Sequence, residues 1–155
     1  YMGFTNLCRA LNDTKNYSDA VKACNRALEL NAGDGESYYY KGRAFDMLGR
    51  AAEATTMYAR AVTGLEKFVE DNPDYSDGYY LLGGAYFANN ETNKAIEAYK
   101  KCLALSPRFT KAISNLGFAY IKNKNKVAAQ QQLAVLQQYD ATRAATLKRE
   151  IDKMR

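Results

Sequence analysis

Hydrophobic residues recur along this chain at spacings of three and four, which places them on one face of a helix. The longest such stripe alternates the two spacings over five residues: Ala54, Tyr58, Ala61, Leu65 and Phe68. It predicts a single helix from about Ala51 to Glu70, roughly 30 Å long at 1.5 Å per residue. The chain has only two prolines. Because proline breaks helix interiors, the rest of the chain is free to be helical as well.

The stripes repeat in a fixed order of small and large residues. The clearest copy reads Tyr79-x2-Leu82-Gly83-x2-Tyr86, then Ala95-x3-Tyr99, then Pro107. A second copy begins 34 residues later and reads Ile113-x2-Leu116-Gly117-x2-Tyr120, then Ala129-x3-Leu133. Looser copies begin at Phe4 and Tyr38, also 34 residues apart, whereas Tyr38 and Tyr79 are 41 apart. A recurring period of this length is the signature of a repeat protein.

Over roughly residues 1–140 this pattern resembles the tetratricopeptide-repeat family, although Cys8, Lys41 and Leu133 depart from it. The resemblance implies an all-α fold, a right-handed superhelix (α-solenoid) of antiparallel helix pairs. We expect a single domain over 1–155. Its repeats cover about 1–34, 35–75 (with a seven-residue insertion), 76–109 and 110–140, and a capping helix covers 141–155.

Three details of the packing are expected from the pattern. The glycines at 42, 83 and 117 should face Ala54, Ala95 and Ala129, so that paired helices approach closely. Asp34 should cap the helix that follows it. The extended second-repeat helix should overhang its neighbours, and its end then needs cover either from the loop carrying Tyr75 or from a partner.

The chain offers little for catalysis or metal binding. It contains no histidine, which removes the commonest general base and a common metal ligand. Its three cysteines, Cys8, Cys24 and Cys102, show no CxxC spacing, so we expect reduced, buried thiols. We expect Cys8 and Cys24 to lie about one turn out of level on facing helices. No phosphate-binding GxxxxGK[ST] loop occurs. The sequence therefore predicts no enzyme, no cofactor and no metal.

Partner binding is the expected function, and the resemblance implies that the inner wall of the superhelix carries it. The stripe that should line this wall lies about 100° round the first helix of each repeat from the packing stripe. Its residues are Thr5, Arg9, Asn12, Tyr39, Arg43, Asp46, Tyr80, Gly84, Phe87, Ser114, Phe118 and Ile121. Aromatic residues of this kind are frequent in binding hot spots. We expect Tyr80, Phe87 and Phe118 to form an aromatic pocket over Gly84. The wall lacks the residues of the family's clamp for chaperone carboxyl termini.

Charge bears on the choice of partner. Residues 110–155 carry nine basic and three acidic residues, out of a net charge of +5 for the whole chain. A basic end could meet acidic protein, nucleic acid or an anionic surface. Lys122, Lys124 and Lys126 have no interleaved aromatics, so nucleic acid is not the expected partner. No segment is long and apolar enough to span a membrane. Two functions stay open: an adaptor that binds a peptide or helix in its groove, and a structural module that self-associates (a homo-oligomer) or docks through its ends or its extended helix.

Overall fold

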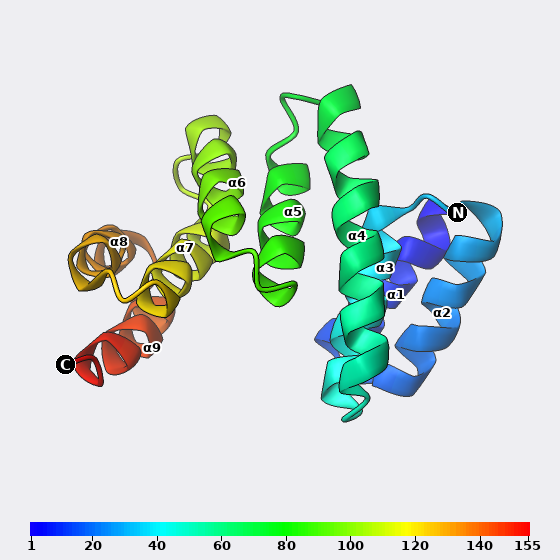
Figure 1. Cartoon of the computed structure of the whole chain (residues 1–155), viewed down its shortest axis with the longest axis horizontal. Coiled ribbons are helices and arrows are strands. Elements are labelled where there is room, and N and C mark those ends of the chain that lie inside the picture. The colour runs from blue at the N-terminus through cyan, green and yellow to red at the C-terminus, as the bar shows by residue number, and fades with distance from the viewer. The chain divides into compact units, whose positions relative to one another are not determined.

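The computed structural model describes residues 1–155, the whole chain, as nine α-helices without strands (Figure 1). The helices form two compact units, Tyr1–Pro73 and Asp74–Arg155. Each unit is built from helix pairs whose members are joined by short turns, so that consecutive helices run antiparallel. The prediction of an all-α solenoid of helix pairs is confirmed. That residues 1–155 make up a single domain stays a prediction.

The first unit holds the first two repeats. Its helices are α1 (Met2–Asp13), α2 (Tyr17–Leu30), α3 (Gly35–Met47) and α4 (Ala51–Asp71). The pairs α1–α2 and α3–α4 pack along their lengths, and α3 also contacts both α1 and α2. At 21 residues, α4 is the long helix that the sequence predicted.

The extended part of α4 packs tightly against the turn before α3. A Cβ added at Gly64 would lie 2.7 Å from the carbonyl oxygen of Gly33, and one at Gly35 would lie 2.5 Å from the backbone nitrogen of Leu65. These two backbones therefore touch, which only glycine permits. Further along the same face Leu65 and Val69 are buried, whereas Phe68 is 40% exposed.

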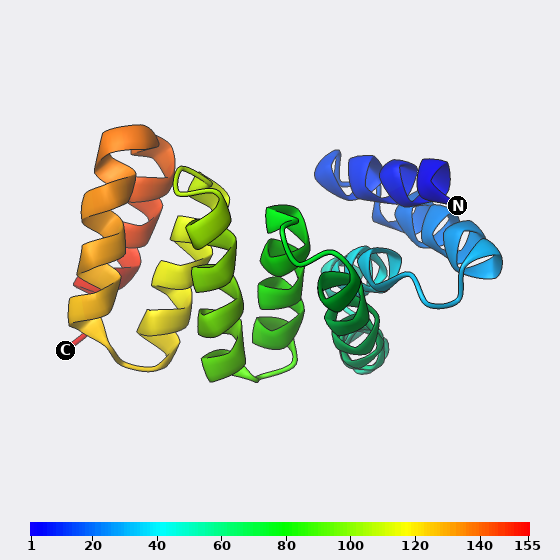
Figure 2. The same cartoon turned by 90° about the horizontal axis from the view of Figure 1, so that it is seen from above.

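The second unit holds the last two repeats and the capping helix. Its helices are α5 (Ser76–Ala88), α6 (Thr92–Leu105), α7 (Thr110–Lys122), α8 (Lys126–Tyr139) and α9 (Ala141–Asp152). Each packs on the next, and α7 also contacts α5 and α9, so the five helices lie side by side (Figure 2).

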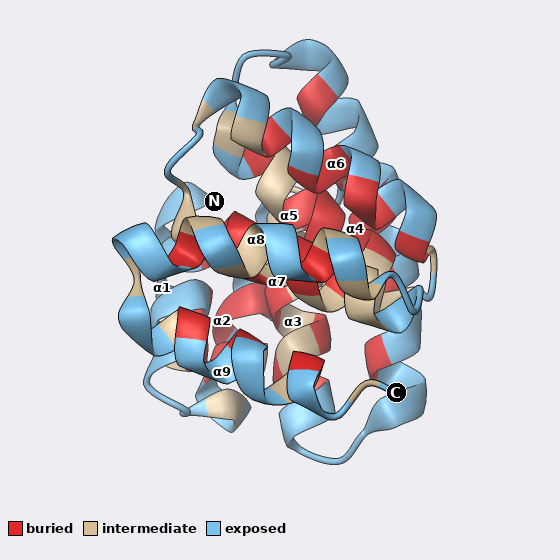
Figure 3. Cartoon of the chain, turned by 90° about the vertical axis from the view of Figure 1, so that its left-hand side faces the viewer, coloured by how far each residue is buried: buried red, intermediate tan, exposed pale blue.

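The ninth helix closes this unit as predicted. Ala144, Leu147 and Ile151 are buried and join a core cluster that includes Ile113 of α7 and Leu136 of α8. The opposite side of α9 is exposed and carries Lys148, Arg149, Asp152 and Lys153. Figure 3 shows buried and exposed bands alternating along α8 and α9. A polar outer face of this kind is what the end of a solenoid needs.

The three glycines at the helix crossings have neighbours other than those predicted. The nearest atoms to an added Cβ are ring atoms of Tyr58 for Gly42, at 2.8 Å, and of Tyr99 for Gly83, at 2.6 Å. For Gly117 the nearest atom belongs to Leu147 of α9, at 2.6 Å. The glycines thus make room for large side chains, and the alanines are not the closest neighbours.

Candidate partner-binding surface

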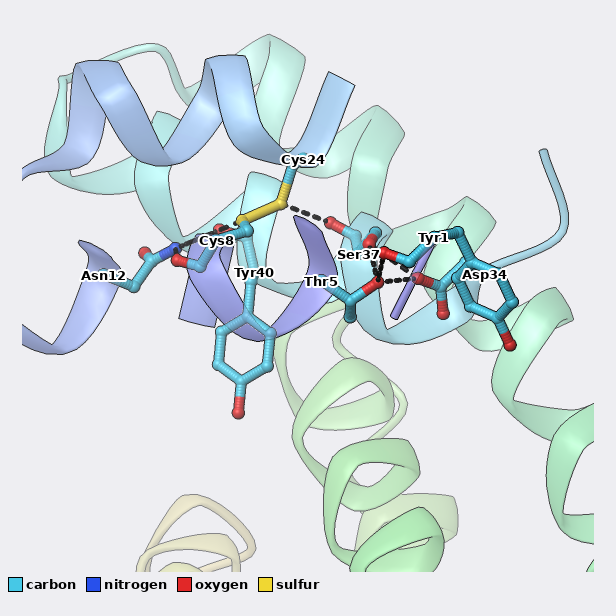
Figure 4. Close-up of a disulfide and its surroundings, with 8 residues drawn as sticks. All are labelled: Tyr1, Thr5, Cys8, Asn12, Cys24, Asp34, Ser37 and Tyr40. Carbon is cyan, nitrogen blue, oxygen red and sulfur yellow. Dashed lines mark hydrogen bonds between the residues drawn. A yellow bond between two sulfur atoms is a disulfide. The ribbon is translucent and has the colours of Figure 1, made fainter. Parts of the chain in front are cut away.

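The first repeat contains a disulfide, which corrects the expectation of reduced thiols. Cys8 of α1 and Cys24 of α2 are bonded to each other, with their Cα atoms 5.2 Å apart, and both are fully buried (Figure 4). The turn between the helices is Thr14–Asn16, so the two cysteines lie at similar distances from its centre, seven and nine residues from Lys15. Their Cα atoms are close enough for a bond, so the expected offset of one turn is wrong. Cys102 is the one free cysteine, and it is buried.

Two of the predicted wall residues in the first unit tie α1 to α3. The hydroxyl of Thr5 donates to Asp34 Oδ2 at 2.7 Å, and the hydroxyl of Ser37 donates to the same oxygen at 2.6 Å (Figure 4). The side-chain amide of Asn12 donates to the carbonyl oxygens of Cys8 and Tyr40 at 3.0 and 3.1 Å. Thr5 and Asn12 are both buried. They lie in the contact between the two helices.

Asp34 also differs from its predicted role. It occupies the N-cap position of α3, but its side chain accepts no hydrogen bond from the backbone of that helix. Its carboxylate instead binds the two hydroxyls described above.

The other four wall residues of the first unit contact neighbouring side chains. The exposed Arg9 lies 3.5 Å from Glu36, and the guanidinium of Arg43 lies 5.9 Å from the ring centre of Tyr40. Asp46 accepts a hydrogen bond from the Tyr58 hydroxyl at 2.8 Å, and the ring of Tyr39 lies 6.1 Å from that of Tyr58. Burial, together with this hydrogen bond to Asp46, raises the pKa of Tyr58 well above its usual value.

In the second unit the wall residues of α5 are more open. Tyr80 and Phe87 are half-buried and Gly84 between them is buried. The Tyr80 ring lies 4.8 Å from that of Phe109, at the start of α7. The ammonium group of Lys122, at the end of α7, lies 4.8 Å from the ring centre of Phe87. That lysine also donates to the side-chain oxygen of Asn90 at 2.9 Å.

The predicted wall residues of α7 also include both buried and half-buried side chains. Ser114 is buried, whereas Phe118 and Ile121 are half-buried and pack against the core cluster that α9 completes. Because α5 and α7 contact each other, Tyr80, Phe87, Phe118 and Ile121 occupy corresponding faces of two neighbouring helices. The aromatic pocket predicted over Gly84 stays a prediction.

The structure adds a shallow depression that the sequence did not reveal. Its volume is about 540 Å³, and its lining residues are Ser76, Asp77, Ser106, Pro107, Arg108 and Phe109. The hydroxyls of Ser106 and Ser76 are hydrogen-bonded at 2.9 Å. Phe109 joins this depression to the face of α5, since it also contacts Tyr80. The sequence pattern did not reveal that the turn carrying Ser106 lies beside α5.

The structure shows neither a group of metal ligands nor a helix that could cross a membrane. No three His, Cys, Asp or Glu side chains lie close enough together to hold a metal ion. None of the nine helices combines the length and the apolar character needed to cross a bilayer.

Sequence profiles of the tetratricopeptide repeat match residues 7–64 and 76–109. The chain belongs to the tetratricopeptide-repeat family. Tetratricopeptide proteins are generally non-enzymatic scaffolds, and the repeats make this chain a protein-interaction module in that general sense. The four helix pairs and the capping helix agree with about four repeats.

Solved tetratricopeptide structures have the same fold. TTC0263 of Thermus thermophilus is 20% identical, with a TM-score of 0.72 over 99% of this chain and 80% of that one. MamA from Desulfovibrio magneticus is 26% identical, with a TM-score of 0.60 over 97% and 76%. YrrB, described as having an unusual peptide-binding site, is 18% identical, with a TM-score of 0.53 over 94% and 90%. The sequence matches none of the curated proteins with which it was compared.

Proposed function

We propose that this tetratricopeptide chain is an adaptor that binds an apolar peptide segment or helix of a partner protein across α5 and α7. The observation that carries this proposal is the set of four half-buried apolar side chains on two contacting helices. These are Tyr80, Phe87, Phe118 and Ile121. The fold supports the proposal in general terms, since one tetratricopeptide protein of similar structure is described as having a peptide-binding site.

The half-buried state of these side chains is suited to binding. Their inner atoms pack on their own unit, which limits the conformational entropy lost when a ligand orders them. Their outer atoms remain in water, and a ligand would gain by covering them, at about 25 cal/mol per Å² of apolar area. Lys122 adds one charge beside Phe87, so an acidic residue or a backbone carbonyl next to the ligand's apolar side chain is favoured.

The first unit supports this function less directly. Thr5 and Asn12 are buried in the contact between α1 and α3, so they are not free to meet a ligand. Ligand binding by Arg9 and Arg43 stays a prediction from the sequence. Catalysis is not part of the proposal, because no nucleophile is paired with a general base in a chain without histidine.

A selection experiment tests the proposal without a known partner. Random twelve-residue peptides displayed on phage are selected on the wild-type chain, and the affinity of the best is measured by fluorescence anisotropy. The double variant Tyr80→Ala/Phe87→Ala should weaken binding by about tenfold to a hundredfold or more, since hot-spot aromatics typically contribute 2 kcal/mol or more. Circular dichroism should still show a folded helical protein.

Two control variants make the result specific. Leu105→Ala/Val127→Ala removes exposed apolar side chains of α6 and α8 and should leave the affinity unchanged. Charge reversal at Lys124 and Lys126 should change it little. The proposal is wrong if selection yields no binder, if the aromatic variant binds as well as wild type, or if the lysine variant alone abolishes binding. The last result would place the site at the basic end.

A further inference from the structure

Helix α1 carries an apolar stripe that this chain leaves largely exposed, although the guanidinium of Arg26 lies 6.0 Å from the ring centre of Phe4 and Leu11 is half-buried. The stripe consists of five residues at i, i+1, i+4, i+7 and i+8, which share one helix face: Gly3, Phe4, Leu7, Ala10 and Leu11. Phe4 is 37% and Leu7 is 47% exposed, and both small residues are exposed as well. A Cβ added at Gly3 would meet no atom within 4 Å. No charged residue interrupts this α1 stripe.

The corresponding stripe is buried in the later repeats. On α7 its members are Ala112, Ile113, Leu116, Ala119 and Tyr120, and the first four are at most 3% exposed. Within that unit, α6 packs on α7. On α3 the corresponding small residues, Ser37 and Ala44, are fully buried, and Cys24 of α2 contacts the Ser37 carbonyl at 3.1 Å. In both units, a neighbouring helix therefore packs on the helix face that corresponds to the α1 stripe.

We propose that the α1 stripe binds the α1 stripe of a second copy of this chain, antiparallel across a two-fold axis centred on Leu7. In that register residues equally far from Leu7 on opposite sides face each other. Phe4 then faces Ala10 of the second copy, and Gly3 faces Leu11. Every large side chain apart from the central leucine meets a small one, so the stripe is complementary to itself. Such self-complementarity is what a two-fold interface requires.

The surroundings of the stripe favour a second copy over other parts of the same chain. The first repeat, residues 1–34, has four basic and four acidic residues, so two copies meet without net repulsion. The outer side of α9 carries Lys148, Arg149, Asp152 and Lys153, so it has no uninterrupted apolar stripe. The α1 stripe of a second copy is therefore a better match than the outer side of α9.

The size of the stripe sets the expected strength. The largest apolar patch on a typical monomer covers about 300–600 Å², whereas a stable interface buries about 800 Å² on each partner. The α1 stripe, one face of a twelve-residue helix, is in the smaller class. We therefore expect a concentration-dependent dimer that is half-formed on the order of 100 µM. This proposal involves no residue of the α5 and α7 surface and is independent of the proposed peptide binding.

Sedimentation equilibrium of the whole chain from about 10 µM to 1 mM tests the association. The mass should rise from 17.4 kDa towards twice that value. Leu7→Glu should keep the chain monomeric at 1 mM, because it places two like charges face to face at the axis. Val127→Glu, at an apolar residue of α8 that is 66% exposed, is the matched control and should dimerise as wild type does. Tyr80→Ala/Phe87→Ala should also dimerise. Thermal melts at low concentration verify that each variant is folded.

Cross-linking tests the register. With the native disulfide already formed, Leu7→Cys should give a covalent dimer under mild oxidation, because residue 7 of each copy lies on the axis. Met2→Cys is the control, since Met2 is 65% exposed but lies outside the stripe. A chain that remains at 17.4 kDa up to 1 mM overturns the proposal. So does a dimer that Leu7→Glu leaves intact, or one that cross-links through residue 2 and not through residue 7.

Discussion

Replacing Gly83 by alanine tests the packing of the third repeat at one atom. In a solvent-exposed helix interior this change stabilises by up to about 1 kcal/mol, because alanine is the better helix former. At Gly83 the added Cβ would lie 2.6 Å from two ring atoms of Tyr99 and 3.0 Å from a third. The Tyr99 side chain is only 2% exposed, so other parts of the protein surround it. Overpacking of this kind typically costs about 1–3 kcal/mol.

Comparing the free energies of unfolding of two variants isolates the overpacking cost. Gly3→Ala adds the same methyl group to α1, where it meets nothing within 4 Å. Gly83→Ala should therefore be less stable than Gly3→Ala by about 1–3 kcal/mol, the overpacking cost alone. Urea unfolding followed by circular dichroism measures this difference. The protein is kept near 1 µM, so that association through α1 does not contribute.

A third variant assigns the cost to the tyrosine ring. Tyr99→Leu shortens the side chain that the methyl group meets, so it should destabilise Gly83→Ala less than it destabilises wild type. Contacting residues typically show coupling energies of about 0.5–3 kcal/mol. If Gly83→Ala stabilises the chain as much as Gly3→Ala does, or if the coupling is zero, the ring does not fill the space beside Gly83 and the described packing is wrong.

Three further predictions concern the turns and the cysteines. Lys124 lies in the turn after α7 with a φ of 58°, a conformation that costs non-glycine residues about 1 kcal/mol, so Lys124→Gly should raise the free energy of unfolding by about that amount in urea titrations. Thiol titration without reductant should find one thiol in the unfolded chain and none in the native one at pH 8. Cys102 is buried, and this burial, with the charge of Asp77, raises its pKa to about 12. The backbone N–H of Arg143 holds the pKa of Asp140 below its usual value, so this carboxylate stabilises α9 at neutral pH and the effect is lost as pH falls. Asp140→Ala should lower the Tm at pH 7, and its difference in Tm from wild type should shrink as the pH falls through the lowered pKa of this carboxylate.

The sequence predicts the helices well, because the order of small and large residues records which face of each helix is buried. Two turns between paired helices have a signal in the sequence too, since Gly49 and Asn90 are residue types that tolerate the positive φ found there. Lys15 and Lys124 adopt a positive φ at the corresponding turns of the first and fourth repeats, although lysine gives no such signal. The long α4 follows from its uninterrupted stripe.

The candidate site was harder to predict. A helical pattern shows to which side of its helix a side chain points, but not which residues of other helices it contacts. Thr5, Asn12 and Ser114 point to the predicted side of their helices, yet all three are buried. For Thr5 the cause is a carboxylate outside its own helix, Asp34, which a pattern within one helix cannot reveal. Phe109 and Lys122 were missed because each acts on a residue of α5 from the end of a neighbouring helix.

The disulfide of the first repeat restricts which mutations this chain can accept. Cys8 and Cys24 occupy the positions at which the second repeat has Gly42 and Tyr58, and there a Cβ on the glycine would lie 2.8 Å from the ring. Cys24→Tyr alone would press a ring against the Cys8 side chain, whereas Cys8→Gly alone would leave a thiol beside an unfilled space. Each single step passes through a poorly packed repeat. The covalent pair and the glycine–tyrosine pair are thus two separate solutions for one helix crossing, and only a simultaneous change of both residues avoids a poorly packed intermediate.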